Sequence, residues 1–126
     1  MVQVWTNGED SKNLENALEV LEASTKDKES ADLKAFVMVV TDPAKMEPIG
    51  KELTSLAEKL KIERTGLTYL SKDNHGVSAY KINLEPDVKN TVFVYRRKKV
   101  TDKFVNLTWD EKGISTLKEA IDKVTN

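Results

Sequence analysis

Few residues in this sequence have side chains that could carry out chemistry. The chain contains no cysteine and a single histidine, His75. Thiol–disulfide exchange needs a thiolate as its nucleophile, so that reaction is excluded for this chain, and thiolate metal sites are excluded with it. His75 lies in the sequence Asp73-Asn74-His75-Gly76, which is typical of a turn. A general base also needs an orienting partner and a pocket, and the neighbouring residues supply neither.

The oxygen-bearing side chains do not have the spacing of a known metal site. Asp42, Asp73 and Asn74 could hold a hard cation only if loops brought three or more oxygens together, and no EF-hand spacing is present. The sequence also lacks a glycine-rich phosphate loop, a nucleophile elbow and an HExxH helix. We therefore predict no catalytic residue, no metal and no cofactor.

The strongest local charge is the run Arg96-Arg97-Lys98-Lys99. Such a cluster could contact phosphate, an acidic protein or a lipid surface. No aromatic residue alternates with these cations to stack on bases, and a turn between two strands is normally polar. We interpret Arg96, Arg97, Lys98 and Lys99 as a solvated turn that also protects an edge strand from unwanted pairing.

The segment from Trp5 to Ser11 joins an apolar run to an amphipathic one and forms a further candidate site. Free main-chain N–H groups at the start of a helix could bind an anion or a peptide carboxylate. Glu9 and Asp10 would repel an anion, however, and they favour plain capping of the helix. Trp5 is either an exposed docking residue or a buried residue at the end of a strand.

The bulk properties describe one ordinary domain over residues 1–126, with a net charge of −1. Nothing in this charge points to nucleic acid, and no apolar run is long enough for a membrane helix. The first residues do not have the pattern of a signal peptide. We expect a soluble chain, either cytoplasmic or exported with its leader removed, that is a monomer or a weak homo-oligomer.

Apolar periodicity predicts the elements that hold these residues. Two continuous apolar runs, residues 35–40 and 91–95, are typical of central strands that are covered on both faces. Shorter runs predict strands at residues 2–5, 67–70 and 100–107. Helical spacing predicts helices around residues 14–21, 49–60 and 114–124, with a short helical turn at 77–82.

The order of these elements indicates an α/β fold. Alternation of strands and helices implies parallel, right-handed units, and the close final pair of strands implies an antiparallel hairpin. We predict a three-layer sandwich, with a central mixed sheet of four to five strands and helices on both faces.

The ends and faces of the helices can also be predicted. Thr108-Trp109-Asp110-Glu111 has the form of a capping box, with Thr108 as N-cap of the last helix and Glu111 three residues on. Gly113 near that helix start is expected to cost some stability. In the first helix the acids, among them Glu22, lie opposite the apolar residues.

The order and lengths of these elements resemble the thioredoxin-like superfamily over nearly the whole chain. The closest local likeness is the stretch Asn90–Tyr95 with the basic turn, strand and helix that follow. The resemblance implies a CxxC motif after the first strand and a cis-proline near Asn90. Here the first place reads Thr6-Asn7-Gly8-Glu9-Asp10-Ser11, without a thiol, and the second is asparagine. A cis bond before a residue other than proline costs about 3–4 kcal/mol, so we predict a trans bond there.

Both parts of the redox site are missing, and peroxiredoxin activity is excluded because it too needs a cysteine. The resemblance therefore implies a degenerate, redox-inactive domain that binds a protein or a peptide in the remaining groove. The candidate binding residues in that groove are Trp5, Asn7, Gly8, Asp42, Asn90 and Thr91. The alternatives are a thiol-independent enzyme or small-ligand-binding protein that uses the same groove, and a structural subunit of a larger assembly.

Overall fold

The computed structural model describes residues 1–7, 11–80, 82, 88–97 and 99–125. The predicted strands are all present, as β1 (Val2–Thr6), β2 (Ala35–Thr41), β3 (Thr65–Ser71), β4 (Asn90–Arg96) and β5 (Lys99–Val105). The helices are α1 (Ser11–Asp27), α2 (Met46–Leu60), α3 (His75–Ala79) and α4 (Glu111–Thr125). Two short 3₁₀ turns, Glu29–Ala31 and Pro43–Lys45, precede β2 and α2.

The five strands form one mixed sheet in the order β3-β2-β1-β4-β5. β1, β2 and β3 are parallel, while β4 runs antiparallel to both β1 and β5. The α/β class and the mixed sheet are therefore confirmed. Within the described part of the chain, no helix is long and apolar enough to cross a membrane.

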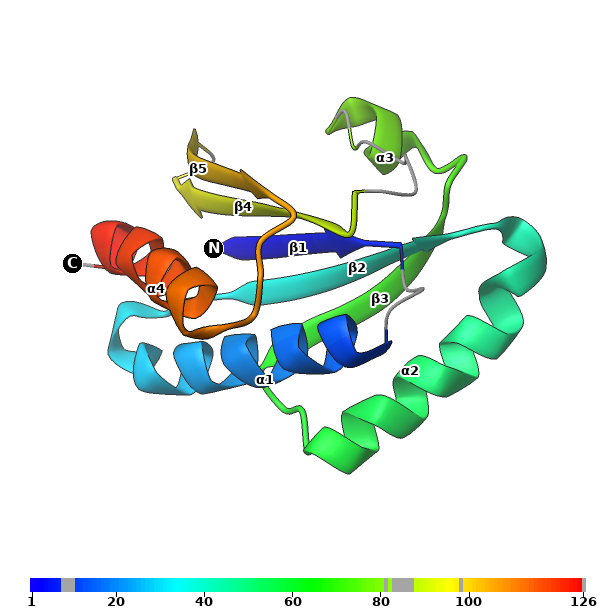
Figure 1. The fold of residues 1–126 in the computed structure, drawn as a ribbon, viewed down its shortest axis with the longest axis horizontal. Helices are drawn as coiled ribbons and strands as arrows, with labels where there is room; N and C mark the ends of the chain where they lie inside the picture. The colour runs from blue at the N-terminus through cyan, green and yellow to red at the C-terminus, as the bar shows by residue number, and fades with distance from the viewer. Residues whose placement is uncertain (8–10, 81, 83–87, 98, 126) are drawn as a thin grey trace.

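The helices cover the two faces of the sheet unequally (Figure 1). α1, α2 and α4 pack on one face, which we call the helix-covered face, through leucines such as Leu18, Leu53 and Leu117. Val4, Val37 and other valines of the central strands meet them there. Two successive right-handed crossovers, from β1 to β2 and from β2 to β3, move in one direction and so place α1 and α2 on the same side.

The opposite face, which we call the open face, carries only α3 among the described helices. Its core consists of Trp5, Met38, Val40, Val77, Phe93 and Tyr95. We predicted helices on both faces, and in the described part of the chain this face carries one helix of five residues. That helix begins at His75, two residues before the predicted helical turn.

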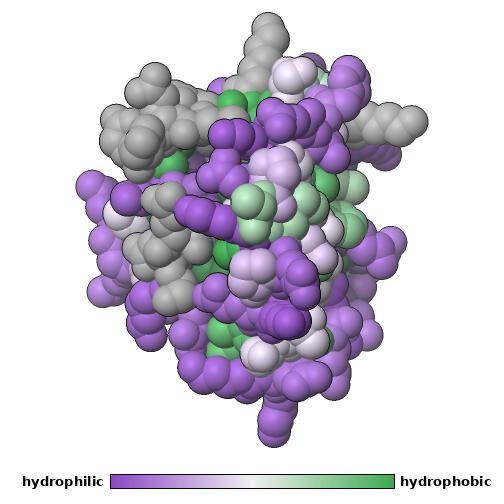
Figure 2. All heavy atoms as spheres, turned by 90° about the vertical axis from the view of Figure 1, so that its right-hand side faces the viewer, coloured by the Kyte–Doolittle hydropathy of each residue, from purple (hydrophilic) through white to green (hydrophobic). Residues whose placement is uncertain are grey.

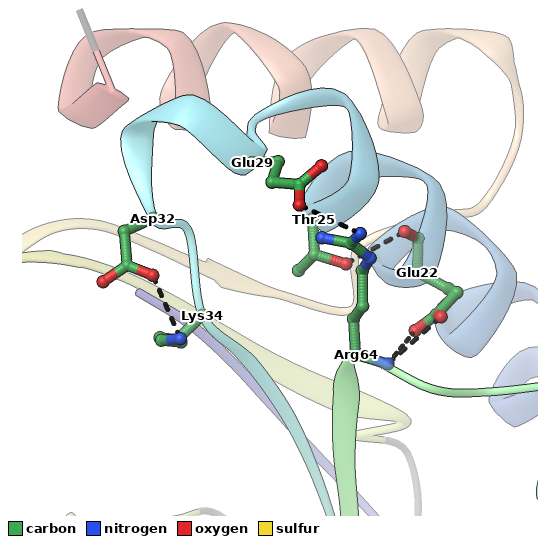
Figure 3. A network of polar contacts seen from close by, with 6 residues as sticks. All are labelled: Glu22, Thr25, Glu29, Asp32, Lys34 and Arg64. Carbon is green, nitrogen blue, oxygen red and sulfur yellow. Dashed lines mark hydrogen bonds and ion pairs between the residues drawn. The ribbon is translucent and has the colours of Figure 1, made fainter.

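A carboxylate of α1 fixes the entry of the chain into β3 (Figure 3). Glu22 accepts hydrogen bonds from the main-chain N–H groups of Glu63, Arg64 and Thr65, at 2.9 to 3.1 Å, and from the Thr65 hydroxyl. Arg64 in turn forms an ion pair with Glu29 at 3.3 Å. Glu22 therefore does more than line the polar side of its helix.

The start of α4 differs from the predicted capping box. α4 begins at Glu111, and the Asp110 carboxylate accepts the N–H of Gly113 at 2.8 Å, so Asp110 is the cap. Thr108 donates its hydroxyl hydrogen to that same carboxylate. These two hydrogen bonds, that from Gly113 first, hold the pKa of Asp110 below its usual range.

Candidate functional site

The candidate site lies at the carboxyl end of β1, where the chain order of the sheet changes direction. β1 connects through α1 to β2 on one side, and its other neighbour, β4, comes much later in the chain. Ligands of open α/β sheets bind outside the carboxyl ends of strands at such a switch point. In the antiparallel register Thr6 lies opposite Asn90 and Trp5 lies opposite Thr91.

Four of the six predicted binding residues meet at this point. Trp5, Asn7, Asn90 and Thr91 line a small cavity together with the apolar side chains of Val40, Ile82 and Val88. Its volume of about 20 Å³ is close to the space of a single water molecule. The cavity among the described residues is therefore too small to hold a large side chain of a bound peptide.

The other two predicted residues do not join this cavity. Gly8 lies outside the described residues. Asp42 follows the end of β2 and forms an ion pair with Lys72 at 2.7 Å. The hydrogen bond and charge of Lys72 hold the pKa of Asp42 below its usual range.

The side chain of Asn90 forms hydrogen bonds that join two segments of the chain. It is 2% exposed, and its amide donates to the main-chain oxygen of Leu107 at 2.9 Å and accepts the Leu107 N–H at 2.9 Å. This pair of hydrogen bonds ties the start of β4 to the chain between β5 and α4. The peptide bond before Asn90 is trans, as predicted, since the described residues contain no cis bond.

Trp5 is buried, which decides between the two interpretations of this residue. It is 4% exposed, and its ring lies 5.4 Å from that of Tyr80. A row of neighbouring rings continues across the open face through Phe93 to Tyr95, with centroids 6.0 to 6.1 Å apart. Burial, and then the neighbouring hydroxyl of Tyr80, raise the pKa of Tyr95 to about 12.

The polar residues at the start of α3 lie outside the cavity beside Trp5. Asn74 caps this helix by accepting the Gly76 N–H at 2.8 Å. His75, the first residue of the helix, is exposed and does not line the cavity beside Trp5. Among the described residues no group of three or more carboxylates and imidazoles could hold a metal ion.

The basic turn lies at the far end of the β4–β5 hairpin. Arg96 ends β4 and Lys99 begins β5, so these two residues belong to strands and only Arg97 is a described turn residue. Arg97 has a φ of 51°, the left-handed value that a two-residue hairpin turn requires. All three are exposed, while Lys98 lies outside the described residues. The exposure of these three residues agrees with a solvated turn, and binding by the turn stays the alternative to that interpretation.

The sequence did not point to a second surface, the open face. Six large apolar side chains of the described chain are exposed, and five of them belong to this face. They are Met1, Phe36, Tyr80, Val100 and Val105, with exposed fractions of 38 to 52%. The continuous apolar run of β2 predicted that Phe36 would be covered, and the sequence did not show that the covering helix is so short.

The carboxyl end of the sheet has a different character. Figure 2 shows this side of the molecule, and its surface is mostly hydrophilic, with apolar atoms in small separate areas. Among the described residues, the exposed large apolar side chains therefore lie mainly along the open face.

Comparison with known proteins adds no relative. The chain matches no protein-family model, and comparisons with curated proteins and with solved structures likewise give no match.

Proposed function

We propose that this chain is a redox-inactive, thioredoxin-like module that binds another protein. The proposal combines the resemblance of the element order with the absence of cysteine. It is supported by the register of β1 and β4, which brings the positions of the two missing redox elements, Thr6 and Asn90, opposite each other. The Thr6 hydroxyl also donates to the main-chain oxygen of Lys89 at 2.9 Å.

The partner docks on the open face, and one observation carries this statement. Five of the six large apolar side chains that are exposed in the described part of the chain lie there, next to the row of rings from Trp5 to Tyr95. A sheet buries its apolar face against helices, and among the described residues the five of α3 are the only helical cover on this face. Exposed apolar patches of this kind mark sites of protein association.

An amphipathic helix with an acidic flank suits this surface. A helix is the element that completes the missing layer of the sandwich. Lys103 stands over the ring of Phe93, with its ammonium nitrogen 5.7 Å from the ring centre, so a cation borders the apolar surface. A glutamate beside the apolar stripe of the partner helix would pair with this cation.

A designed peptide tests this function. The probe is an 18-residue helix with leucines on one face and glutamates along its flank, titrated into the ¹⁵N-labelled chain. We expect amide shifts on β1, β2, β4 and β5. Binding should weaken roughly fivefold in Phe36→Ser, because part of a phenylalanine contact is lost.

The matched control is Tyr69→Ser. Tyr69 is 37% exposed and Phe36 is 38% exposed, but Tyr69 lies on the helix-covered face. This control should bind the peptide as the wild type does. No binding at about 1 mM peptide, where even a weak complex would be populated, contradicts the proposal, and so does an equal loss in both variants.

A further inference from the structure

The two edges of the sheet are protected to different degrees. The edge strand β5 carries Lys99, Asp102 and Lys103, and its pairing with β4 contains a register shift. Charges and irregular pairing of this kind prevent a sheet from adding further strands. The other edge strand, β3, has seven residues and no charge, Thr-Gly-Leu-Thr-Tyr-Leu-Ser. Among the described elements β3 pairs with β2 alone, so its outer edge is open to another strand.

A shallow groove, broadly open to solvent, lies beside this open edge. It has a volume of about 740 Å³ and is lined by one side of α2 and by the ring of Tyr69. A Cβ atom on Gly50 would stand 2.8 Å from the Tyr69 hydroxyl oxygen, so the ring lies directly against the helix. A strand added to β3 would direct every second side chain to this side of the sheet, toward the groove.

We propose that a second copy of this chain pairs with this edge, β3 against β3, antiparallel about a two-fold axis at Thr68. The main-chain groups of an open edge are complementary to another strand, and this chain itself carries a neutral strand of matching length. A contact that uses the same surface on both copies closes as a dimer. The resulting sheet has ten strands and continues from one copy into the other.

The register centred on Thr68 pairs neutral side chains throughout the strand. Leu67 lies opposite Tyr69 of the second copy on the groove side, an aliphatic–aromatic pair that is favourable across strands. On the other side Gly66 lies opposite Leu70 of the second copy. The Phe36 ring covers Gly66, because a Cβ there would meet its Cδ1 atom at 2.5 Å, so the exposed ring of Phe36 also gains a neighbour.

Two cations flank the paired segment. The same register places Arg64 opposite Lys72 of the second copy. Each cation already has an acidic partner in its own chain, Arg64 with Glu29 at 3.3 Å and Lys72 with Asp42 at 2.7 Å. These ion pairs reduce the repulsion between the flanking cations, and the uncharged strand between them determines the contact.

Sedimentation velocity of the full chain tests the dimer. We expect the wild type to shift from monomer to dimer between about 1 and 200 μM, the concentration range of a weak contact between two edge strands. Thr68→Lys brings two like charges together at the axis and should weaken association at least roughly tenfold. Thr68→Glu should do the same, and an equimolar mixture of these two variants should dimerise again.

The control is Val100→Lys, which adds the same charge to the opposite edge strand at a side chain that is 43% exposed. It should associate as the wild type does. A wild type that stays monomeric throughout overturns the proposal, as does association that Thr68→Lys leaves unchanged or that the mixture fails to restore. Far-ultraviolet circular dichroism of each variant verifies that the fold is kept.

Discussion

Glu22→Gln tests the carboxylate that joins α1 to the start of β3. In the wild type three consecutive main-chain N–H groups, from Glu63 to Thr65, donate to its two oxygens. Glutamine keeps one oxygen but presents an NH₂ group, itself a donor, to the remaining N–H groups. At least one of these donors then loses its acceptor, and the others lose the charge of theirs.

The size of the effect follows from these contacts. A hydrogen bond to a charged group contributes about 1.5–3 kcal/mol, and the half-exposed position of Glu22 lets water replace part of it. We therefore expect the free energy of unfolding to fall by about 2 kcal/mol. For a chain of 126 residues this lowers the melting temperature by roughly 8 °C. Urea unfolding followed by circular dichroism at pH 7 measures the difference.

The same carboxylate gives a pH dependence of defined sign. Burial acts to raise the pKa of Glu22, but the main-chain and hydroxyl donors outweigh it and hold the pKa below its ordinary value of 4.5. A carboxylate whose pKa is lower in the folded state stabilises the protein above the unfolded pKa, and this stability is lost as the pH falls through the folded pKa. The gap between wild type and Glu22→Gln should therefore shrink between about pH 6 and pH 3.

Glu19→Gln is the matched control. Glu19 lies one turn earlier in α1 and is exposed, so its substitution should change the free energy of unfolding by no more than about 0.5 kcal/mol. If both variants lose equally little stability, or if the gap for Glu22→Gln does not depend on pH, the carboxylate does not anchor β3. The account of how β3 is held would then be wrong.

Two further substitutions test single contacts by urea unfolding. Asn90→Ala leaves the part-buried N–H and oxygen of Leu107 without their Asn90 partner, so we expect the free energy of unfolding to fall by about 2 kcal/mol. A fall of less than about 1 kcal/mol would show that the contact contributes little. Gly113→Ala should destabilise by about 1–3 kcal/mol, because its Cβ would lie 2.7 Å from the Thr108 carbonyl carbon. Helix propensity alone predicts the opposite sign, a gain of about 1 kcal/mol, so stabilisation would contradict the observed packing.

The sequence allowed the elements to be predicted because their apolar periodicity is strong. Every predicted strand and long helix is present, since alternation and helical spacing depend only on neighbouring residues. The predicted N-cap of α4 was wrong because two capping signals overlap at the start of this helix. Thr108 with Glu111 fits a capping box, but Asp110 accepts from Gly113, and local propensity does not decide between such competing caps.

Contacts between distant residues could not be predicted from the sequence. Glu22 reaches residues that follow it by 41 to 43 positions, and the pattern of its own helix only places it on the polar side. Asn90 was expected to bind a ligand, yet its side-chain amide forms hydrogen bonds with the main chain of Leu107, 17 residues later. In both cases a polar side chain satisfies main-chain groups of another segment, which requires the tertiary structure to be known.

The open face and the open edge have one topological cause. The chain passes from β1 to β2 to β3 in one direction, so α1 and α2 lie on the same side and β3 becomes an edge. α3 precedes β4 on the far side of β1 and is the one described helix on the opposite face. The continuous apolar run of β2 predicts a strand covered twice, but Phe36 remains 38% exposed. A partner helix and a second copy can be distinguished by the two experiments, because the peptide titration requires the open face and the sedimentation of the chain alone requires the free edge of β3.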